Sequence, residues 1–208
     1  MHRGQALACS WRFEQEAWQS GRREVGGADE VGRGALCGPV VAAVVVLGEE
    51  FDTNGLDDSK RLTERQRERL SERIRARARA FCVGSADSQE VDRLNILRAT
   101  HLALRRAFEG LSRQLDLLLL DALTVPGISV EQRAIVKGDA LCFSIAAASV
   151  VAKVERDALM RECDERYPGY GLARNMGYAS EDHRDALRRL GPSAIHRRSF
   201  HGTQRWLF

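Results

Sequence analysis

The sequence predicts a single domain of the α/β or α+β class, in which helices pack on a sheet. Val40–Leu47 is an unbroken apolar run, rich in valine, as expected of a strand buried on both faces. Leu115–Leu120 is a second aliphatic run, and it ends abruptly at Asp121. Strand patterns come first along the chain and then alternate with helical patterns, an order typical of such sheets.

Length and composition indicate a soluble globular protein. The 208 residues suffice for one core, and 44% hydrophobic with 29% charged residues is an ordinary balance. No apolar run approaches a membrane span, and the N-terminus lacks the continuous apolar segment of a signal peptide. The five cysteines are an odd number without a Cys-x-x-Cys pair, which favours reduced thiols over a disulfide or zinc framework. We therefore expect a cytoplasmic protein with no membrane partner.

The first elements should be a helix, two strands and a second helix. Residues 10–20 carry aromatic anchors and should form a short helix, followed by strands at 25–29 and 40–47 joined by a glycine-rich turn. Thr63 and Gln66 match a capping box, so a helix should begin there and run to about residue 80. That helix is rich in arginine, which favours a solvated face and leaves a nucleic-acid flank as the alternative.

The rest of the chain should alternate strands and helices. The expected strands are 81–86, 115–120 and 134–136, and the expected helices are 88–94, 95–108, 144–166 and 180–190. Pro168-Gly169 should end the long helix, and a loop is expected from there to Tyr178.

Four acidic residues lie at predicted strand ends or in tight turns: Asp29, Glu30, Asp121 and Asp139. Converging at one sheet edge, they would repel one another unless cations neutralise them. Carboxylate oxygens suit Mg²⁺ and Mn²⁺, and two such ions can activate water and stabilise the leaving oxygen in phosphoryl transfer. Asp29 and Glu30 are neighbours, so both can serve only if the strand ends or bulges there. The simpler alternative is a glycine-rich hairpin that carries surface charges.

Further residues could belong to the same site. Gly32-Arg33-Gly34 follows the acidic pair; its glycines permit close backbone approach, and the arginine can meet an anion. Asp157 is another acid, but we expect it to be ion-paired because it lies mid-helix after a Lys-x-x-Arg stretch. The sequence has no His-Glu-x-x-His, Walker or Gly-x-Ser-x-Gly motif, so zinc hydrolysis, nucleotide hydrolysis and serine chemistry have no support.

Six ordered blocks of the chain are similar to the signatures of one family. They are 27–34, 56–63, 94–100, 137–157, 167–178 and 196–200. Together they resemble the type 2 ribonuclease H family, whose bacterial members include ribonuclease HII, over about residues 25–200. The chain departs from the family pattern at Ala35, where proline is common, and at residues 174–176, which are usually more basic.

The resemblance implies a ribonuclease H-like α/β fold, a mixed sheet flanked by helices. Residues 1–208 would form one catalytic domain, of which about 167–208 would be a helical, substrate-binding C-terminal extension. The implied enzyme is an endonuclease that cuts the RNA strand of RNA/DNA hybrids and cuts 5′ of ribonucleotides embedded in duplex DNA. It would leave a 3′-hydroxyl and a 5′-phosphate and use Mn²⁺ or Mg²⁺, two ions per active site during catalysis.

The resemblance also implies roles for individual residues. The catalytic, metal-binding carboxylates would be Asp29, Glu30, Asp121 and Asp139. The backbone of Gly32-Arg33-Gly34 would read the ribose 2′-hydroxyl, the group that separates RNA from DNA. Tyr178 would stack on the neighbouring deoxyribose and Lys60 would contact a phosphate, with a core tyrosine and a solvated lysine as the simpler alternatives. His183 and His196 are candidate acid/base groups, but in the resembled family proton transfer is assigned mainly to metal-bound water and phosphate. His196, beside Arg197 and Arg198, is interpreted as a structural or phosphate-facing group.

Other functions remain to be weighed against the ribonuclease. A structure-selective DNA nuclease of the same superfold would share the acids but has no need of Gly32-Arg33-Gly34 or Tyr178. A non-catalytic hybrid-binding module would be expected to have lost one of the acids, and none is missing.

The last five residues, Gln204–Phe208, resemble the Gln-x-x-Leu-Phe peptide by which bacterial proteins dock on the sliding clamp. We favour the simpler interpretation, in which this segment packs its aromatic side chains on the protein. The expected state is a monomer.

Overall fold

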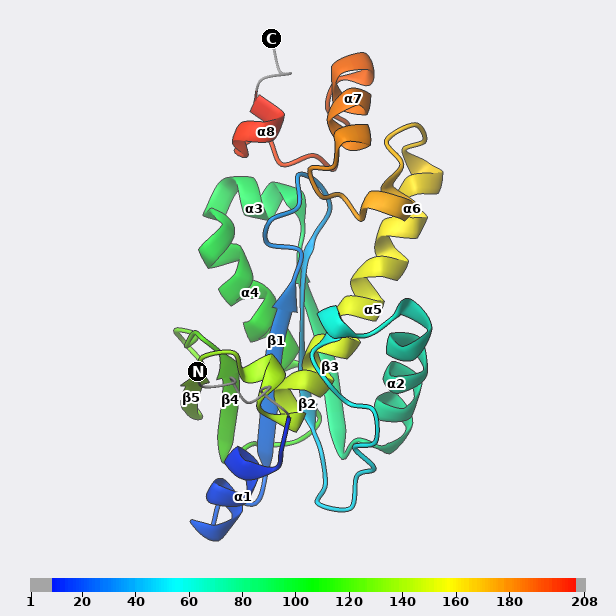
Figure 1. Ribbon diagram of the computed structural model, residues 1–208. Helices are drawn as coiled ribbons and strands as arrows, with labels where there is room; N and C mark the ends of the chain where they lie inside the picture. Colours follow the sequence, from blue (N-terminus) through cyan, green and yellow to red (C-terminus); the bar gives the residue numbers. More distant parts are fainter. Residues whose placement is uncertain (1–8, 205–208) are drawn as a thin grey trace, which may run out of the picture.

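Residues 9–204 are described by the computed structural model, as a five-stranded sheet with helices on both faces (Figure 1). The strands are β1 (Val25–Val31), β2 (Val40–Val46), β3 (Ala80–Ala86), β4 (Leu117–Asp121) and β5 (Glu131–Ile135). The longer helices are α1 (Arg12–Gln19), α2 (Glu64–Arg77), α3 (Ser88–Leu94), α4 (Ile96–Glu109), α5 (Phe143–Arg166) and α7 (Glu181–Leu190). Short helices of three or four residues are η1 (Ser59–Arg61), η2 (Gly138–Ala140), α6 (Leu172–Asn175) and α8 (His201–Gln204).

The strand order is β3-β2-β1-β4-β5, with β1 in the centre. β1 runs antiparallel to β2 and parallel to β4; β2 and β3 are antiparallel, and β4 and β5 are parallel. The prediction of a mixed sheet flanked by helices is therefore confirmed.

The core lies in two layers, one on each face of the sheet. Alternate residues of β2, beginning with Val40, join the cluster under α4, and the residues between them, beginning with Val41, join the cluster under α5. Every residue of β2 is buried. This two-sided burial is the reason that the strand appears in the sequence as an unbroken apolar run.

Two glycines let the helices approach the sheet closely. A Cβ atom at Gly27 in β1 would collide with the backbone of Ser144 and Ile145 in α5, and one at Gly84 in β3 would collide with the backbone of α4. The side chains in the first turns of α5 are small or apolar and are buried, as the alanine run in the sequence predicts. Close packing of α5 on β1 brings the helix beside the acidic pair of that strand.

A buried side chain of α1 caps α5. The N-cap residue of α5, Cys142, makes no side-chain cap of its own. Instead a Glu14 carboxylate oxygen accepts hydrogen bonds from the Ser144 N–H at 2.8 Å and the Cys142 thiol at 3.2 Å. The carboxylate thus satisfies a free donor at the positive end of the helix dipole.

The short helices were not predicted from sequence. α6 lies inside the segment expected to be a loop, and its first residue, Leu172, is fully buried and donates its N–H to Asp164 at 2.7 Å. Four residues are too few to show a hydrophobic period, and contacts such as these stabilise the turn. The edge strand β5 begins three residues earlier than expected. The prediction missed its first three residues because they are polar and exposed or partly exposed, and therefore show no apolar strand pattern.

The C-terminal elements pack around residues 32–39, the loop between β1 and β2. Leu36 and Cys37 of this loop share an apolar cluster with Met160 of α5, Leu172 of α6 and Leu187 of α7. Figure 1 shows the loop extending beyond the end of the sheet toward α6 and α7. The division into a catalytic part and an extension from about residue 167 stays a prediction. No helix in residues 9–204 is long and apolar enough to span a membrane.

Candidate metal and nucleic-acid site

The acidic pair lies where β1 separates from β4. β1 keeps regular pairing with β2 through Val31, so the strand neither ends nor bulges at Asp29, contrary to expectation. Its pairing with β4 stops at Ala28 opposite Leu120, one residue before the acids. Room for the carboxylates therefore arises from the divergence of two parallel strands.

Asp29 and Glu30 point to different faces of the sheet. Ala28 belongs to the cluster under α4, so strand alternation directs Asp29 toward α5 and Glu30 toward the α4 side. Accordingly, the Ser149 side chain of α5 lies close enough to Asp29 to oppose the rise in the pKa of its carboxyl. Glu30 forms an ion pair with Arg33 at 3.0 Å.

Asp121 and Asp139 come from the end of β4 and from η2. One Asp121 carboxylate oxygen accepts the Gly138 N–H at 2.8 Å, which holds η2 against the strand end. Asp139, the residue after Gly138, is buried, and its carboxylate forms an ion pair with Lys60 at 2.7 Å. All four predicted carboxylates therefore lie around the same edge of the sheet.

Mutual repulsion is visible in the electrostatics of the site. Burial raises the pKa of Asp29 well above its ordinary value, and the charges of Glu30 and Asp121 add to the effect. Burial and Asp121 raise the pKa of Glu30, against the opposing effect of Arg33. Burial also raises the pKa of Asp121, with Asp139 contributing. A bound cation would relieve this repulsion.

The donor set fits a hard divalent cation. It consists of carboxylate oxygens alone, which suit Mg²⁺ and Mn²⁺ better than Zn²⁺. In residues 9–204, no three of the acids have oxygens that all lie within 4.8 Å of one another. The cluster is therefore looser than a closed cage, as expected of like charges.

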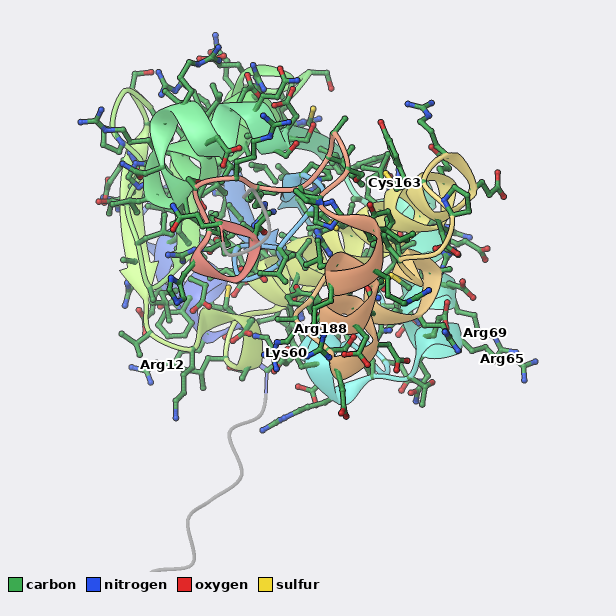
Figure 2. All side chains as sticks on the ribbon, turned by 90° about the horizontal axis from the view of Figure 1, so that it is seen from above. Arg12, Lys60, Arg65, Arg69, Cys163 and Arg188 are labelled. Carbon is green, nitrogen blue, oxygen red and sulfur yellow. The ribbon has the colours of Figure 1, made fainter. Side chains whose placement is uncertain are left out.

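Lys60 contacts one of the carboxylates, whereas Tyr178 contacts Arg156. The Lys60 side chain is 74% exposed although its ammonium contacts Asp139; it is labelled in Figure 2. Burial opposes its charge, but the hydrogen bond and attraction to Asp139 outweigh burial and hold its pKa above the ordinary value. Tyr178 is 37% exposed, and the Arg156 guanidinium lies 5.3 Å from the centre of its ring.

The two glycines around Arg33 have different surroundings. Gly32 has a φ of +92°, and a Cβ there would collide with the guanidinium of Arg156. A Cβ at Gly34 would meet nothing within 4 Å. Gly32 is therefore required by the protein's own packing, while Gly34 leaves space on the solvent side.

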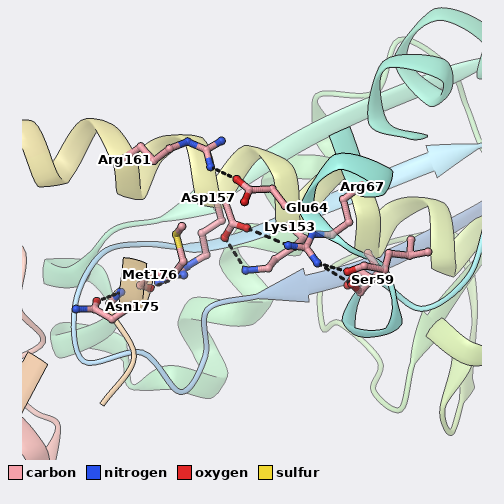
Figure 3. Close-up of polar contacts among 12 residues, drawn as sticks. Ser59, Glu64, Arg67, Lys153, Asp157, Arg161, Asn175 and Met176 are labelled. Carbon is pink, nitrogen blue, oxygen red and sulfur yellow. Dashed lines mark hydrogen bonds and ion pairs between the residues drawn. The ribbon is translucent and has the colours of Figure 1, made fainter. Parts of the chain in front are cut away.

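Asp157 is ion-paired, as expected. Its carboxylate contacts Lys153 at 2.6 Å and Arg67 at 3.9 Å (Figure 3). These contacts commit the residue to joining α2 and α5.

The arginines of α2 face acids or solvent. Arg73 pairs with Asp52 and Arg75 with Glu155, while Figure 2 shows Arg65 and Arg69 at the outer edge of the molecule. This supports the solvated face over the nucleic-acid flank.

One cluster was not predicted as such. In the described part of the chain, the only group of three or more His, Cys, Asp or Glu residues whose ligand atoms all lie within 4.8 Å of one another is Cys37, His183 and His196, all buried. One thiol and two imidazoles could bind a metal ion, but only if each imidazole offers an unprotonated nitrogen to it. The positions of the protons on the two rings therefore decide whether the cluster is a metal site.

The hydrogen bonds fix those protons. The Tyr178 carbonyl can only accept, so His183 carries its proton on Nδ1 and its Nε2 is an acceptor. The Ser193 N–H donates to His196 Nδ1, so His196 carries its proton on Nε2, 3.1 Å from His183 Nε2. That N–H lies where a metal would need a lone pair. The cluster is a hydrogen-bonded chain that holds the Tyr178 backbone, in agreement with the structural interpretation of His196.

Arg156 and Arg197 lie in the blocks at 137–157 and 196–200, but the sequence indicated no role for either. Both are fully buried beneath the 32–39 loop. A signal for Arg156 exists in the sequence: it falls between Ala152 and Met160 at four-residue spacing, on a helix face that is otherwise apolar and buried.

Known proteins share both the sequence and the fold. A family model described as "Ribonuclease HII" matches residues 26–203. The ribonuclease HII of Desulfitobacterium hafniense (strain Y51) is 52% identical over 196 residues, covering 94% of this chain and 75% of the relative. The ribonuclease H2 of Pyrococcus horikoshii OT3 has a TM-score of 0.72 at 25% identity, covering 88% of this chain and 96% of that one. A Bst-RNase HIII solved in complex with Mn²⁺ has a TM-score of 0.68 at 17% identity, covering 88% and 69%.

Proposed function

Because the chain belongs to the ribonuclease HII family, we propose that its acidic edge is the active site of an RNA/DNA-hybrid endoribonuclease that also cuts 5′ of ribonucleotides embedded in duplex DNA. Membership makes the protein a ribonuclease H, a hydrolase that acts on RNA in hybrids. The observation that carries the assignment of the site is the meeting of four carboxylates, from β1, β4 and η2, where β1 and β4 diverge.

The proposed metal ligands are those carboxylates, listed as Asp29, Glu30, Asp121 and Asp139. Bound Mn²⁺ or Mg²⁺ would supply Lewis-acid stabilisation of the phosphate charge and a more acidic water, and we propose two ions during catalysis. Support comes from the raised pKa of Asp29, which marks a buried carboxylate short of positive charge, and from the Mn²⁺ complex of a protein with this fold.

The proposed substrate contacts surround the carboxylates. The Gly34 N–H has no partner in the described residues and is free to donate to a ribose 2′-hydroxyl. Arg33 is exposed beside it, and Lys60 is placed to contact a phosphate once a cation takes over Asp139. Tyr178 presents a partly exposed ring to the neighbouring deoxyribose.

A duplex DNA with one ribonucleotide tests the proposal. With Mg²⁺ or Mn²⁺ the protein is expected to nick this duplex once, on the 5′ side of the ribonucleotide, leaving a 3′-hydroxyl that a DNA polymerase extends. The matched all-DNA duplex should stay intact, and EDTA should stop the reaction. No nick, or equal nicking of the all-DNA duplex, would overturn the proposal, and the latter would favour the DNA nuclease.

Alanine at the two loop glycines separates packing from recognition. Gly34→Ala should melt at the temperature of the parent, because its Cβ meets nothing, yet cut the ribonucleotide duplex roughly tenfold more slowly if the sugar approaches there. Gly32→Ala should lose both thermal stability and activity, because its Cβ strikes Arg156 and its φ is positive. A full-speed Gly34→Ala enzyme would remove the loop from substrate recognition.

The finer assignments on partners and location rest on the sequence. We propose a cytoplasmic monomer that binds RNA/DNA hybrid and ribonucleotide-containing duplex DNA. Sliding-clamp docking through Gln204–Phe208 stays a prediction: Gln204 ends α8, and the other four residues lie outside the described part of the chain.

A further inference from the structure

Arg156 joins the two segments proposed to contact substrate. Its guanidinium donates to the carbonyls of Pro39 at 3.0 Å and Cys37 at 3.3 Å, both in the loop between β1 and β2. It also donates to the Met176 carbonyl at 2.9 Å and lies over the ring of Tyr178. One side chain from the middle of α5 therefore contacts both the Gly32–Gly34 loop region and the Tyr178 segment.

Arg197 anchors the same loop through other carbonyls. It donates to the carbonyls of Arg33 at 2.9 Å, Ala35 at 2.8 Å and Gly38 at 2.9 Å. Because the C=O and N–H of a trans peptide point in opposite directions, turning the Arg33 carbonyl inward directs the Gly34 N–H outward. The inward carbonyls thus aim the free amide at the substrate side.

Both arginines are committed to these carbonyls. Each is fully buried, and within residues 9–204 neither has a carboxylate within 4 Å. Burying a guanidinium without a counter-charge is unfavourable, so the carbonyl bonds must compensate for lost hydration. The stability of the fold does not by itself require buried arginines here, because well-packed apolar side chains could fill the same volume without the cost of desolvating a charge.

The backbone couples the two segments directly as well. The Leu36 N–H donates to the Gly177 carbonyl at 2.8 Å. A Cβ at Gly177 would crowd the Cys37 carbonyl and thiol, so the segments are in van der Waals contact. Arg156 lies beneath this junction and bonds to both sides of it.

We propose that Arg156 is a positioning residue that holds the Gly32–Gly34 loop and Tyr178 as one unit, so that recognition of the ribose 2′-hydroxyl is coupled to recognition of the next deoxyribose. The inference rests on the proposed function. If Arg156 acts in this way, the selectivity of the enzyme for an RNA-to-DNA junction depends on Arg156, although this buried residue does not contact the substrate.

Arg156→Lys tests the coupling, because lysine keeps the charge but lacks the planar fork that reaches three carbonyls. We would measure kcat and KM on the single-ribonucleotide duplex and on a uniform RNA/DNA hybrid, which has no deoxyribose after the cut. The kcat/KM on the single-ribonucleotide duplex, divided by the kcat/KM on the hybrid, is expected to be about tenfold lower in Arg156→Lys than in the parent. A fall by the same factor on both substrates would overturn the inference.

A double-mutant cycle with Tyr178→Leu gives a second readout. Tyr178→Leu should reduce junction preference in the parent and have little further effect in the Arg156→Lys background, because coupled residues are not additive. If the two substitutions reduce the junction preference independently, so that the double variant shows the product of the two single effects, the proposal is contradicted. Arg161→Lys is the matched control, five residues along α5 in an exposed pair with Glu64 (Figure 3), and should leave both substrates unchanged.

Two safeguards keep the outcomes distinct. If the parent protein cuts neither substrate, the proposed function fails; if it discriminates but Arg156→Lys lowers both rates equally, only the coupling fails. Should Arg156→Lys not fold, hydrogen exchange in the parent answers the same question. The amides of Leu36, Gly38 and Tyr178 are expected to open at one common rate, and clearly separate rates would overturn the coupling.

Discussion

Asp29→Asn is expected to abolish cleavage, by roughly a thousandfold or more, while leaving the fold and most hybrid binding in place. Asp29 is buried on the α5 side of the sheet, and burial together with the charges of Glu30 and Asp121 raises its pKa well above the ordinary value. The amide has nearly the same shape but cannot hold a divalent ion with comparable strength. Phosphate contacts elsewhere should retain affinity for the hybrid.

The same substitution should raise stability in the absence of metal. Removing one charge relieves the repulsion from Glu30 and Asp121 that raises the pKa of Asp29. In EDTA the variant is therefore expected to melt at or above the temperature of the parent. Added Mn²⁺ should stabilise the parent by mass action and the variant much less.

Melting curves, cleavage rates and hybrid affinity together check this prediction. Asp52→Asn is the matched control, since Asp52 lies in an exposed pair with Arg73 away from the site. A variant that melts well below the parent in EDTA would show a structural role for Asp29. Hybrid binding lost in step with cleavage would count against a purely catalytic role.

Gly27→Ala is expected to destabilise the fold by about 3 kcal/mol or more, at the upper end of overpacking effects. The new Cβ would meet the backbone of Ser144 and Ile145, which cannot swing aside as a flexible side chain can. α5 would have to move off β1, and with it Ser149, which lies on α5 beside Asp29. Activity should fall together with stability.

Thermal unfolding measures this effect directly. A loss of about 3 kcal/mol corresponds to a fall in melting temperature of roughly 10 °C for a chain of this size. Gly34→Ala is the matched stability control, because the same substitution there meets open space. A Gly27→Ala protein that melts with the parent would mean that α5 has more freedom on the sheet than its packing indicates.

The sequence alone determined those features that are written in local patterns. The apolar run at Val40 gave a buried strand, the capping box at Thr63 gave the start of α2, and Asn95 caps α4 as expected. The ends of the predicted strands were enough to predict that Asp29 and Asp121 belong to one site. These features depend on neighbours within a few residues or on an ordered set of motifs, both of which a single chain displays.

Only the tertiary structure decided which partner each of these residues meets. It put Asp29 and Glu30 on opposite faces of an unbroken strand, and it showed that Gly32 is a glycine because Arg156 lies against it. It also placed Arg197 beneath a loop more than 150 residues away in sequence. Contacts of this kind depend on how the sheet and α5 pack, and no local period or propensity encodes them. For that reason the sequence was enough to propose which residues form the site, but it did not reveal the contacts that hold those residues in place.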